Sequence, residues 1–400
     1  MKIKSFIVLS LSLLIIFFSY KYGYKKLLEY KFEKTLQAAS KVDPAIWDEK
    51  YQNIKIKDKY KVVFISNNGG EYSYIEYFKY VAEKKGWEVK IYFHQMLGYE
   101  KEIIEFDPDF IMMTIHIDPK MSMEIASHRS KKYILELSPL EFLYSNDFIN
   151  KKHPSKVVDK FNEFLGLADG VLTSAKQIYY YQNLFDKMDK PFNGLRILPL
   201  VPDMNYEITE PEYLAWMGGG IDKFRSSGKF KYFIQLLSEN IPMRIYGRYR
   251  FSAYLPPHIY DGYVPDAMGL FGAIRKNGIY LLTHSAIHTE SATPTLRSFE
   301  AIAAGSVVIS DKHPFIIENF GDNVLYYDQT LSAEEMYNQV KAHFDWIKAN
   351  PEEAKQKAAR AQQIFKEKFS LDNDLERIAK MHEYILMQES EMGLSYPLAY

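Results

Sequence analysis

The regular alternation of short apolar runs with helical stretches constrains the fold of this chain more than any other feature. An apolar run over 61–66 precedes a stretch of helical periodicity over 72–85, and a second apolar run follows at 86–92. The same order recurs between residues 213 and 327. Because a helix between two strands returns the chain to the edge where the first strand began, such strands pair in parallel. The sequence therefore predicts an α/β fold with doubly wound parallel sheets.

An aperiodic stretch divides these elements into two sets. Residues 202–211 begin and end with proline and carry several acidic side chains, which predicts an interdomain linker. The chain has 400 residues, of which 47% are apolar, and this is enough for about two domains of ordinary size. We therefore expect a Rossmann-like first domain over 57–205 and a Rossmann-like second domain over 213–390.

Residues 1–26 predict a membrane anchor. An uncharged run over 5–20 lies between lysines on both sides, and it is short of the roughly 20 residues of a comfortable span. Tyrosines that follow can extend it as an interfacial belt, and no small-residue cleavage site is present. The sequence favours an uncleaved anchor over a cleaved signal peptide or a core helix. We expect a membrane-associated protein with a juxtamembrane linker over 27–56, and the flanking lysines leave the orientation open.

The composition narrows the classes of partner and site. The formal net charge is −1, from 50 basic and 51 acidic side chains, so nothing indicates a nucleic acid as the main partner. The chain has no cysteine, which excludes disulfides and thiolate metal sites.

The strongest functional signal lies in residues 293–311. Thr293 is a suitable N-cap, Pro294 fits the first helical position, and Gly305 suits a left-handed helix end. The N-terminus of a helix offers unpaired N–H groups and partial positive charge, which attract a pyrophosphate. Arg297 and Glu300 lie one turn apart on this helix, where a carboxylate can hold sugar hydroxyls. The alternative is an ordinary strand–helix element with a solvated Arg–Glu pair.

This segment resembles the donor-site signature of the GT-B glycosyltransferases, in the group 1 or family 4-like bacterial branch. The match continues through 313–327; the resemblance extends over about 213–390 and is only architectural over 57–205. It implies two Rossmann-like domains and a last helix, over 371–391, that returns to the first domain. It also implies sugar transfer from a nucleotide-sugar to an acceptor hydroxyl, for a bacterial surface glycan. The acceptor is then a glycan, a lipid-linked sugar or a protein. Arg297 and Glu300 are implied to bind the donor, with Glu300 on the ribose.

Further donor-binding candidates follow the first strands of the second domain. Gly219 and Gly220 come directly after the run over 213–217, and glycines let a backbone approach phosphate closely. The resemblance implies that Arg225 and Lys229 neutralise the donor pyrophosphate, although their spacing from the glycines departs from the usual pattern. Arg248, after the next strand, is another candidate for contact with phosphate or base. A tight turn and ordinary surface charges are the alternatives.

Two residues are candidates for catalysis. In the family, a pair of glutamates separated by seven residues spans the loop and helix; Glu300 matches the second, but position 292 is alanine. Glu290 lies two residues earlier, which leaves its contact with the transferred sugar and the anomeric outcome open. His116 ends an apolar strand of the first domain at the edge where ligands bind, and imidazole titrates near neutrality. A polar loop histidine is the alternative for His116.

The sequence favours a site without metal or cofactor. His284, His288 and Glu290 lie close together, but no further ligand with suitable spacing is apparent for zinc. No Asp-x-Asp motif follows a strand. We therefore expect cationic side chains and a helix end to stabilise the leaving diphosphate in place of a metal ion.

Two other functions stay open. A catalytically inactive GT-B subunit that acts as a scaffold is compatible with the displaced glutamate pair. A two-lobed periplasmic solute-binding protein also has a leader and paired α/β domains, but the single acidic linker argues against it.

Overall fold

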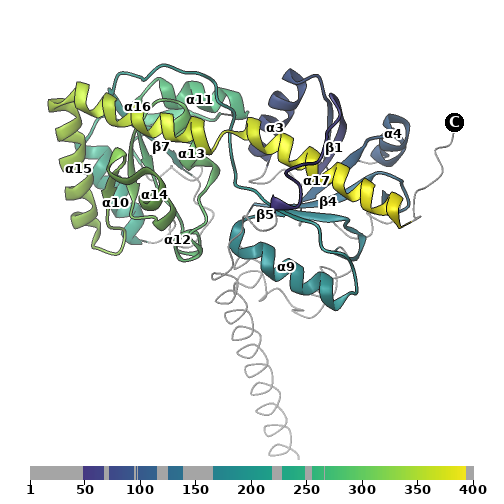
Figure 1. Cartoon of the computed structure of the whole chain (residues 1–400). Helices are drawn as coiled ribbons and strands as arrows, with labels where there is room; N and C mark the ends of the chain where they lie inside the picture. The colour runs from purple at the N-terminus through teal and green to yellow at the C-terminus, as the bar shows by residue number, and fades with distance from the viewer. Residues whose placement is uncertain are drawn as a thin grey trace, which may run out of the picture.

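The structure, a computed structural model, describes residues 48–66, 72–93, 96, 98–114, 125–137, 165–218, 228–247, 255–264 and 266–392. These residues form two lobes, each built on a six-stranded parallel sheet (Figure 1). The predicted α/β class with two doubly wound parallel sheets is confirmed. The anchor predicted over 1–26 and most of the linker predicted over 27–56 lie outside the described residues. No helix in the described ranges combines the length and low polarity needed to cross a bilayer.

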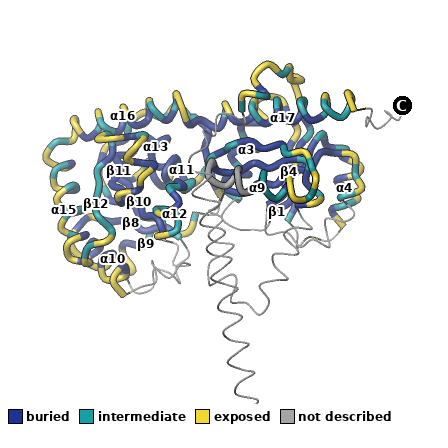
Figure 2. The backbone as a smooth tube through the Cα atoms, turned by 60° about the horizontal axis from the view of Figure 1, so that its bottom comes forward, coloured by how far each residue is buried: buried dark blue, intermediate teal, exposed yellow. Residues whose placement is uncertain are grey.

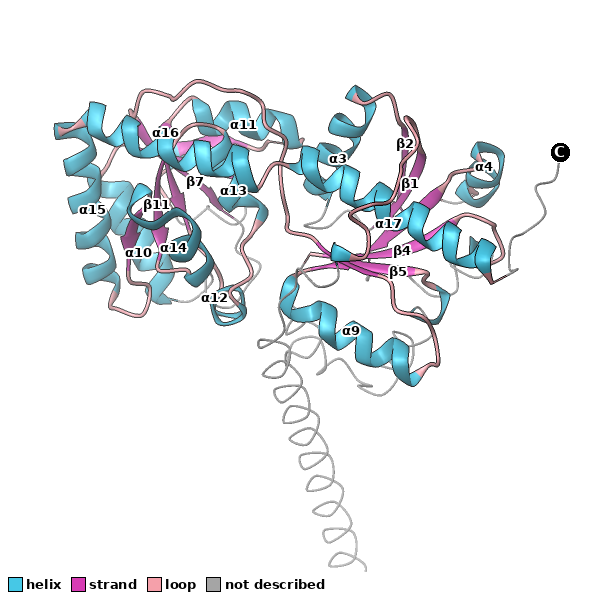
Figure 3. Cartoon of the chain, viewed as in Figure 1, coloured by secondary structure: helices cyan, strands magenta, loops and turns pink. Residues whose placement is uncertain are grey.

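The first sheet has the strand order β2-β1-β3-β4-β5-β6. Its strands are β1 (Lys61–Ser66), β2 (Glu88–Phe93), β3 (Phe110–Thr114), β4 (Lys131–Glu136), β5 (Gly170–Thr173) and β6 (Gly194–Arg196). Its helices are α3 (Tyr72–Lys84), α4 (Tyr99–Phe106) and α9 (Ala175–Lys187). Alternate residues of β1 enter different cores: Val62 and Phe64 pack with α3, whereas Val63 and Ile65 pack with α4 and α9. Apolar residues on both faces explain the continuous apolar runs, because helices cover both sides (Figure 3).

The second sheet has the order β12-β11-β10-β7-β8-β9. Its strands are β7 (Tyr213–Gly218), β8 (Met243–Gly247), β9 (Tyr260–Gly262), β10 (Gly278–Leu282), β11 (Val307–Asp311) and β12 (Leu325–Tyr327). Its helices are α10 (Gly228–Asn240), α11 (Ala267–Arg275), α12 (Ala286–Ser291), α13 (Leu296–Ala303), α14 (Pro314–Phe320), α15 (Ala333–Ala349) and α16 (Pro351–Lys368), with 3-10 turns η2 (Pro257–Ile259) and η3 (Gly321–Asn323). This order reverses between β7 and β10, and ligands of such sheets bind at the carboxyl ends of the strands beside this point.

The central strands of both sheets are buried, whereas the edge strands β2, β9 and β12 are partly exposed. Further exposed residues lie on outer helices such as α15 and α4 (Figure 2). The sequence also predicts a strand over 262–264, but the structure forms this strand, β9, two residues earlier. The 3-10 turn η2 ends directly before it, and the Tyr260 hydroxyl donates to the Gly247 carbonyl at 2.7 Å. This contact aligns β9 beside β8.

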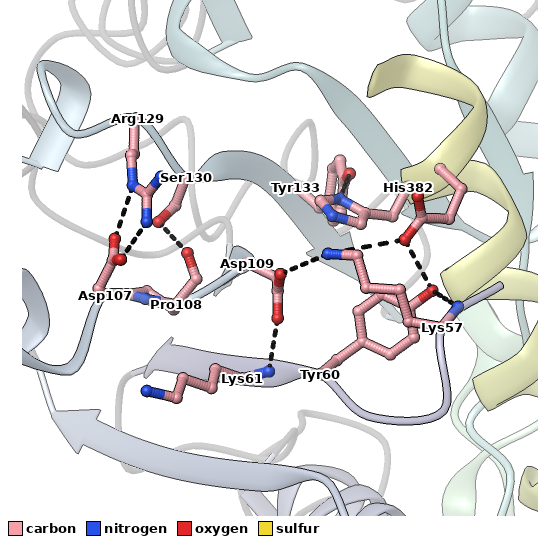
Figure 4. Close-up of polar contacts among 11 residues, drawn as sticks. Lys57, Tyr60, Lys61, Asp107, Pro108, Asp109, Arg129, Ser130, Tyr133 and His382 are labelled. Carbon is pink, nitrogen blue, oxygen red and sulfur yellow. Dashed lines mark hydrogen bonds and ion pairs between the residues drawn. The ribbon is translucent and has the colours of Figure 1, made fainter. Parts of the chain in front are cut away.

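Two segments of the chain pass between the lobes side by side, one before the linker and one before the last helix. Val201, before the linker, forms a parallel bridge with Ser370, just before helix α17 (Leu371–Glu391). Helix α17 then runs along the first lobe, as expected for the last helix (Figure 1). There the His382 Nδ1 and the Tyr133 hydroxyl are 2.7 Å apart, and the Tyr60 hydroxyl donates to Glu383 at 2.9 Å (Figure 4).

Candidate functional site

The helix that carries the strongest sequence signal, α13, begins later than predicted. Its N-cap is Thr295, not Thr293, and Pro294 precedes the helix. The reason is the end of α12: Ala292 adopts a left-handed conformation (φ 52°), and the Thr293 N–H donates to the His288 carbonyl at 3.0 Å. Thr293 and Pro294 are buried between the two helices. The N-terminus of α13 still lies beyond the carboxyl end of β10.

The other end of α13 confirms the expectation for Gly305. This glycine follows the C-cap and has a left-handed backbone with φ 75°. A Cβ atom at this position would lie 2.8 Å from the Glu207 carbonyl oxygen, so the backbone of the linker passes closely. The Thr209 N–H also donates to the Gly305 carbonyl at 3.1 Å. Helix α13 is therefore fastened to the linker at its end.

Arg297 and Glu300 pair with each other at the contact between the two domains. The guanidinium of Arg297 donates to Glu300 Oε2, and the hydroxyl of Tyr77, on α3 of the first domain, lies 2.9 Å from Glu300 Oε1. The Glu300 side chain is 0% exposed, whereas that of Arg297 is 38% exposed. The alternative interpretation, a solvated Arg–Glu pair, is correct about the pair but not about its exposure, because the Glu300 carboxylate is buried against the other domain.

The charges of this contact set the protonation of its members. Burial, together with the negative charge of Glu300, raises the pKa of Tyr77 well above its usual value, so its phenol stays a neutral donor. Burial is the largest single influence on the pKa of Arg297 and acts to lower it, but the charge and hydrogen bond of Glu300, together with the nearby hydroxyls of Tyr280 and Tyr77, raise that pKa. The contact therefore presents a permanent cation beside a hydroxyl donor.

A buried polar network holds α13 against the sheet from behind. His284 follows β10, and its ring bonds Asp311 Oδ1 at 2.8 Å through Nδ1 and Ser298 Oγ at 3.0 Å through Nε2. The ring of His313 lies 4.1 Å from that of His284, and burial lowers the pKa of His313 to about 3. Because Ser298 is next to Arg297 on α13, this network fixes the rotation of the helix and the direction of the Arg297–Glu300 pair.

The three residues that were considered for zinc and rejected, His284, His288 and Glu290, are not placed to share a metal ion. Both ring nitrogens of His284 are engaged as described, and His288 Nδ1 bonds the Thr293 carbonyl at 2.9 Å. Glu290 is exposed on α12. Across the described ranges, no three His, Cys, Asp or Glu side chains are placed to hold a metal ion.

Lys229 is exposed on the first turn of α10, and its ammonium donates to the carbonyls of Gln329 at 3.0 Å and Thr330 at 3.2 Å. These residues follow β12, at the carboxyl edge of the sheet. The remaining predicted site residues lie outside the described residues: His116, Gly219, Gly220, Arg225 and Arg248.

Sequence reasoning missed Tyr77, Ser298 and Asp311. Asp311 ends an apolar strand at the ligand-binding edge, and a search for polar residues at strand ends would have found it. Tyr77 carries no such signal, because it is one of several apolar-face residues of α3. Only the docking of the two domains places it on Glu300.

Comparisons with known proteins support the fold and the family of the second domain. Residues 225–380 match the family model described as glycosyl transferase-like. No curated protein matches the chain in sequence. The solved structure of sucrose-phosphate synthase from Thermosynechococcus elongatus shares 11% identity at a TM-score of 0.52, over 84% of this chain and 100% of that chain.

TarM is similar over a smaller share of its own length. One crystal structure of TarM shares 12% identity at a TM-score of 0.47, over 71% of this chain and 57% of that chain. A structure of a mutant S. aureus TarM with fondaparinux, alpha-GlcNAc-glycerol and UDP shares 14% identity at 0.48, over 71% and 58%. The present chain thus spans less than two thirds of TarM. Residues 225–380 are therefore similar to the glycosyl transferase-like family, and the chain as a whole has the two-domain fold of the GT-B glycosyltransferases.

Proposed function

We propose that this protein transfers a sugar from a nucleotide-sugar to an acceptor hydroxyl. One observation carries the proposal: Arg297 and Glu300 lie beyond the carboxyl end of β10 and face the first domain, at the contact with Tyr77. The family match over 225–380 includes this region. A ligand between two Rossmann-like sheets would meet a cation and a carboxylate at this position.

Each proposed role follows from charge and position. Arg297 is partly exposed on the first turns of α13, where its guanidinium can neutralise a diphosphate whose negative charge grows as it leaves. Glu300 is the proposed acceptor for ribose hydroxyls. Lys229 and, in the loops outside the described residues, Arg225 and Arg248 are proposed to add positive charge. These cations take the place of a metal ion in the proposal.

The roles of the other predicted residues also remain proposals. Gly219 and Gly220 give the backbone a close approach to phosphate, and His116 and Glu290 contact the transferred sugar. We place the protein at a bacterial membrane through residues 1–26, with a surface glycan, a lipid-linked sugar or a protein as acceptor.

The direct test offers the purified protein a panel of UDP-, GDP-, ADP- and dTDP-sugars and measures release of nucleoside diphosphate. We expect sugar-dependent release with one donor. The variant Glu300→Gln keeps the shape and polarity of the side chain but removes its charge. We expect it to weaken binding of that diphosphate by at least about tenfold, as a charged hydrogen bond contributes about 1.5–3 kcal/mol.

The matched control is Glu353→Gln, which removes an exposed carboxylate on the first turn of α16 and should leave affinity and turnover unchanged. Unchanged affinity in Glu300→Gln removes Glu300 from the donor site. Nucleotide binding without turnover by any donor favours the inactive scaffold. If the protein neither binds nor turns over any of these donors, the proposed function is overturned.

A further inference from the structure

The carboxylate that the proposed function assigns to ribose is fully enclosed. The Glu300 side chain is 0% exposed, and its two oxygens bond Arg297 and Tyr77. Arg297 belongs to the same helix and partly reaches solvent. Tyr77 comes from the first domain and is itself buried. A ligand therefore cannot reach Glu300 unless one of these two partners moves.

The Tyr77 hydroxyl is chemically similar to the ribose hydroxyl that would replace it on Glu300. A phenol and a ribose hydroxyl are both neutral O–H donors, and both make a charge-assisted hydrogen bond to a carboxylate. Tyr77 Oη lies 2.9 Å from Glu300 Oε1, the separation that a bound sugar hydroxyl would have. Tyr77 thus occupies the hydrogen-bonding position of a ribose hydroxyl.

A second acceptor makes this displacement inexpensive. Tyr77 Oη also lies 2.7 Å from the carbonyl oxygen of Ala267, the first residue of α11. A phenol has one proton, so Tyr77 donates to only one of the two acceptors at a time. When a ligand takes Glu300, the Tyr77 proton still has the Ala267 carbonyl, and no buried donor loses its partner.

The same residue connects the domains. The ring of Tyr77 packs 5.4 Å from that of Phe271 on α11, and the Ala267 N–H donates to Glu76 Oε2 on α3 at 2.8 Å. Movement of Tyr77 away from Glu300 therefore changes the contact between α3 and α11, which joins the first domain to the second.

We propose that Tyr77 competes with the nucleotide donor for Glu300, so that the first domain restrains the donor site until a donor displaces the hydroxyl. The inference rests on the proposed function, since it requires that Glu300 binds the donor. It makes Tyr77 a positioning residue that lowers donor affinity in the resting protein.

The test compares Tyr77→Phe with the wild-type protein by calorimetric titration with UDP, GDP, ADP and dTDP. The variant keeps the ring that packs on Phe271 and removes the competing hydroxyl. We expect about fivefold tighter binding of the preferred diphosphate, because a typical hydrogen bond contributes about 1 kcal/mol. The control is Tyr51→Phe: Tyr51 is also buried, and its hydroxyl donates to the Gly194 carbonyl at 3.1 Å within the first domain.

The outcomes separate this inference from the proposed function. The competition is supported if Tyr77→Phe binds a diphosphate more tightly than the wild type while Tyr51→Phe binds it as the wild type does. It is also supported if Tyr77→Phe binds a diphosphate and the wild type binds none. Unchanged or weaker binding by Tyr77→Phe overturns it, while wild-type binding and turnover leave the proposed function standing. If neither the wild type nor Tyr77→Phe binds any of the four diphosphates, both are overturned. A thermal unfolding curve for each variant confirms that it is folded.

Discussion

At the scale of residues, the protein buries titratable groups that are not part of the Arg297–Glu300 contact. His313 lies in the second domain, and His382 lies on α17 against the first. Burial lowers the pKa of both to about 3, below the value near 6.5 of a solvated imidazole. Buried Asp374 shifts the other way, since burial raises its pKa to about 6 despite the opposing charge of Arg377.

These shifts predict how stability depends on pH. A histidine that is neutral when folded resists protonation, so stability falls as the pH drops below about 6.5, by about 1.4 kcal/mol per pH unit for each histidine. Asp374 binds its proton more tightly in the folded state, so below about pH 6 its protonation stabilises the protein and offsets the loss from one of the two histidines. We expect the free energy of unfolding, measured with urea, to fall between pH 7 and pH 5.

The variant His382→Gln isolates the contribution of one histidine to this pH dependence. It should reduce the pH dependence between pH 6.5 and pH 5 by about one proton. Beyond its partner Tyr133, the charged groups that act on His382 are Asp109, Lys57 and Lys131. An unchanged slope would show that the buried imidazole of His382 is not the titrating group.

At the scale of elements, the predicted helices and strands were mostly found where the sequence placed them. The strand over 61–66 and the helix over 371–391 agree with β1 and α17. The start of α13 was wrong because the sequence alone did not show that residues 292–294 complete the end of α12. A proline after a threonine fits a helix start in isolation, but the preceding hydrogen bonds decided where the helix begins.

Gly278 offers a sharp test of how the linker fits the second sheet. It begins β10 with φ 75°, and a Cβ atom there would lie 1.8 Å from the Glu210 carbonyl oxygen. Both the backbone conformation and the close approach exclude a side chain, so we expect Gly278→Ala to destabilise the protein by at least about 3 kcal/mol in urea unfolding.

The control for this change is Gly272→Ala in α11, where nothing lies within 4 Å of the added Cβ atom. There alanine should stabilise the helix by roughly 0.5–1 kcal/mol, since it restricts the unfolded chain more than glycine does. Equal effects of the two substitutions would contradict the close packing of the linker on β10.

At the scale of the whole molecule, helix α17 follows the second domain in the chain but packs on the first domain. Arg377 lies at the centre of this contact: it pairs with Asp374 on its own helix, with Asp48 at 2.6 Å, and with the Arg196 carbonyl at 2.5 Å. One hydrophobic cluster continues from α3 and α17 in the first domain to α11, α13 and α16 in the second. The core of the first domain is therefore incomplete without α17.

We expect Arg377→Ala to destabilise the protein by about 3–5 kcal/mol, because it leaves the buried carboxylate of Asp374 without its partner. Urea unfolding measures the loss, and hydrogen exchange should locate it in α17, α3 and β6. Lys380→Ala is the matched control: its ion pair with Glu376 lies nearer the surface of the same helix and should contribute less than about 1 kcal/mol. Similar losses in the two variants would contradict the central role of Arg377.

The sequence by itself determined the fold class, the two sheets and the helix that carries Arg297 and Glu300. Those features follow from local periodicity, from glycines at left-handed positions and from apolar runs, all of which are written in neighbouring residues. The tertiary structure alone decided that Tyr77 reaches Glu300, that His284 reaches Asp311 and Ser298, and that Arg377 of α17 reaches Asp48. These contacts join residues far apart in the chain, and their formation depends on how whole domains pack, which local sequence does not encode.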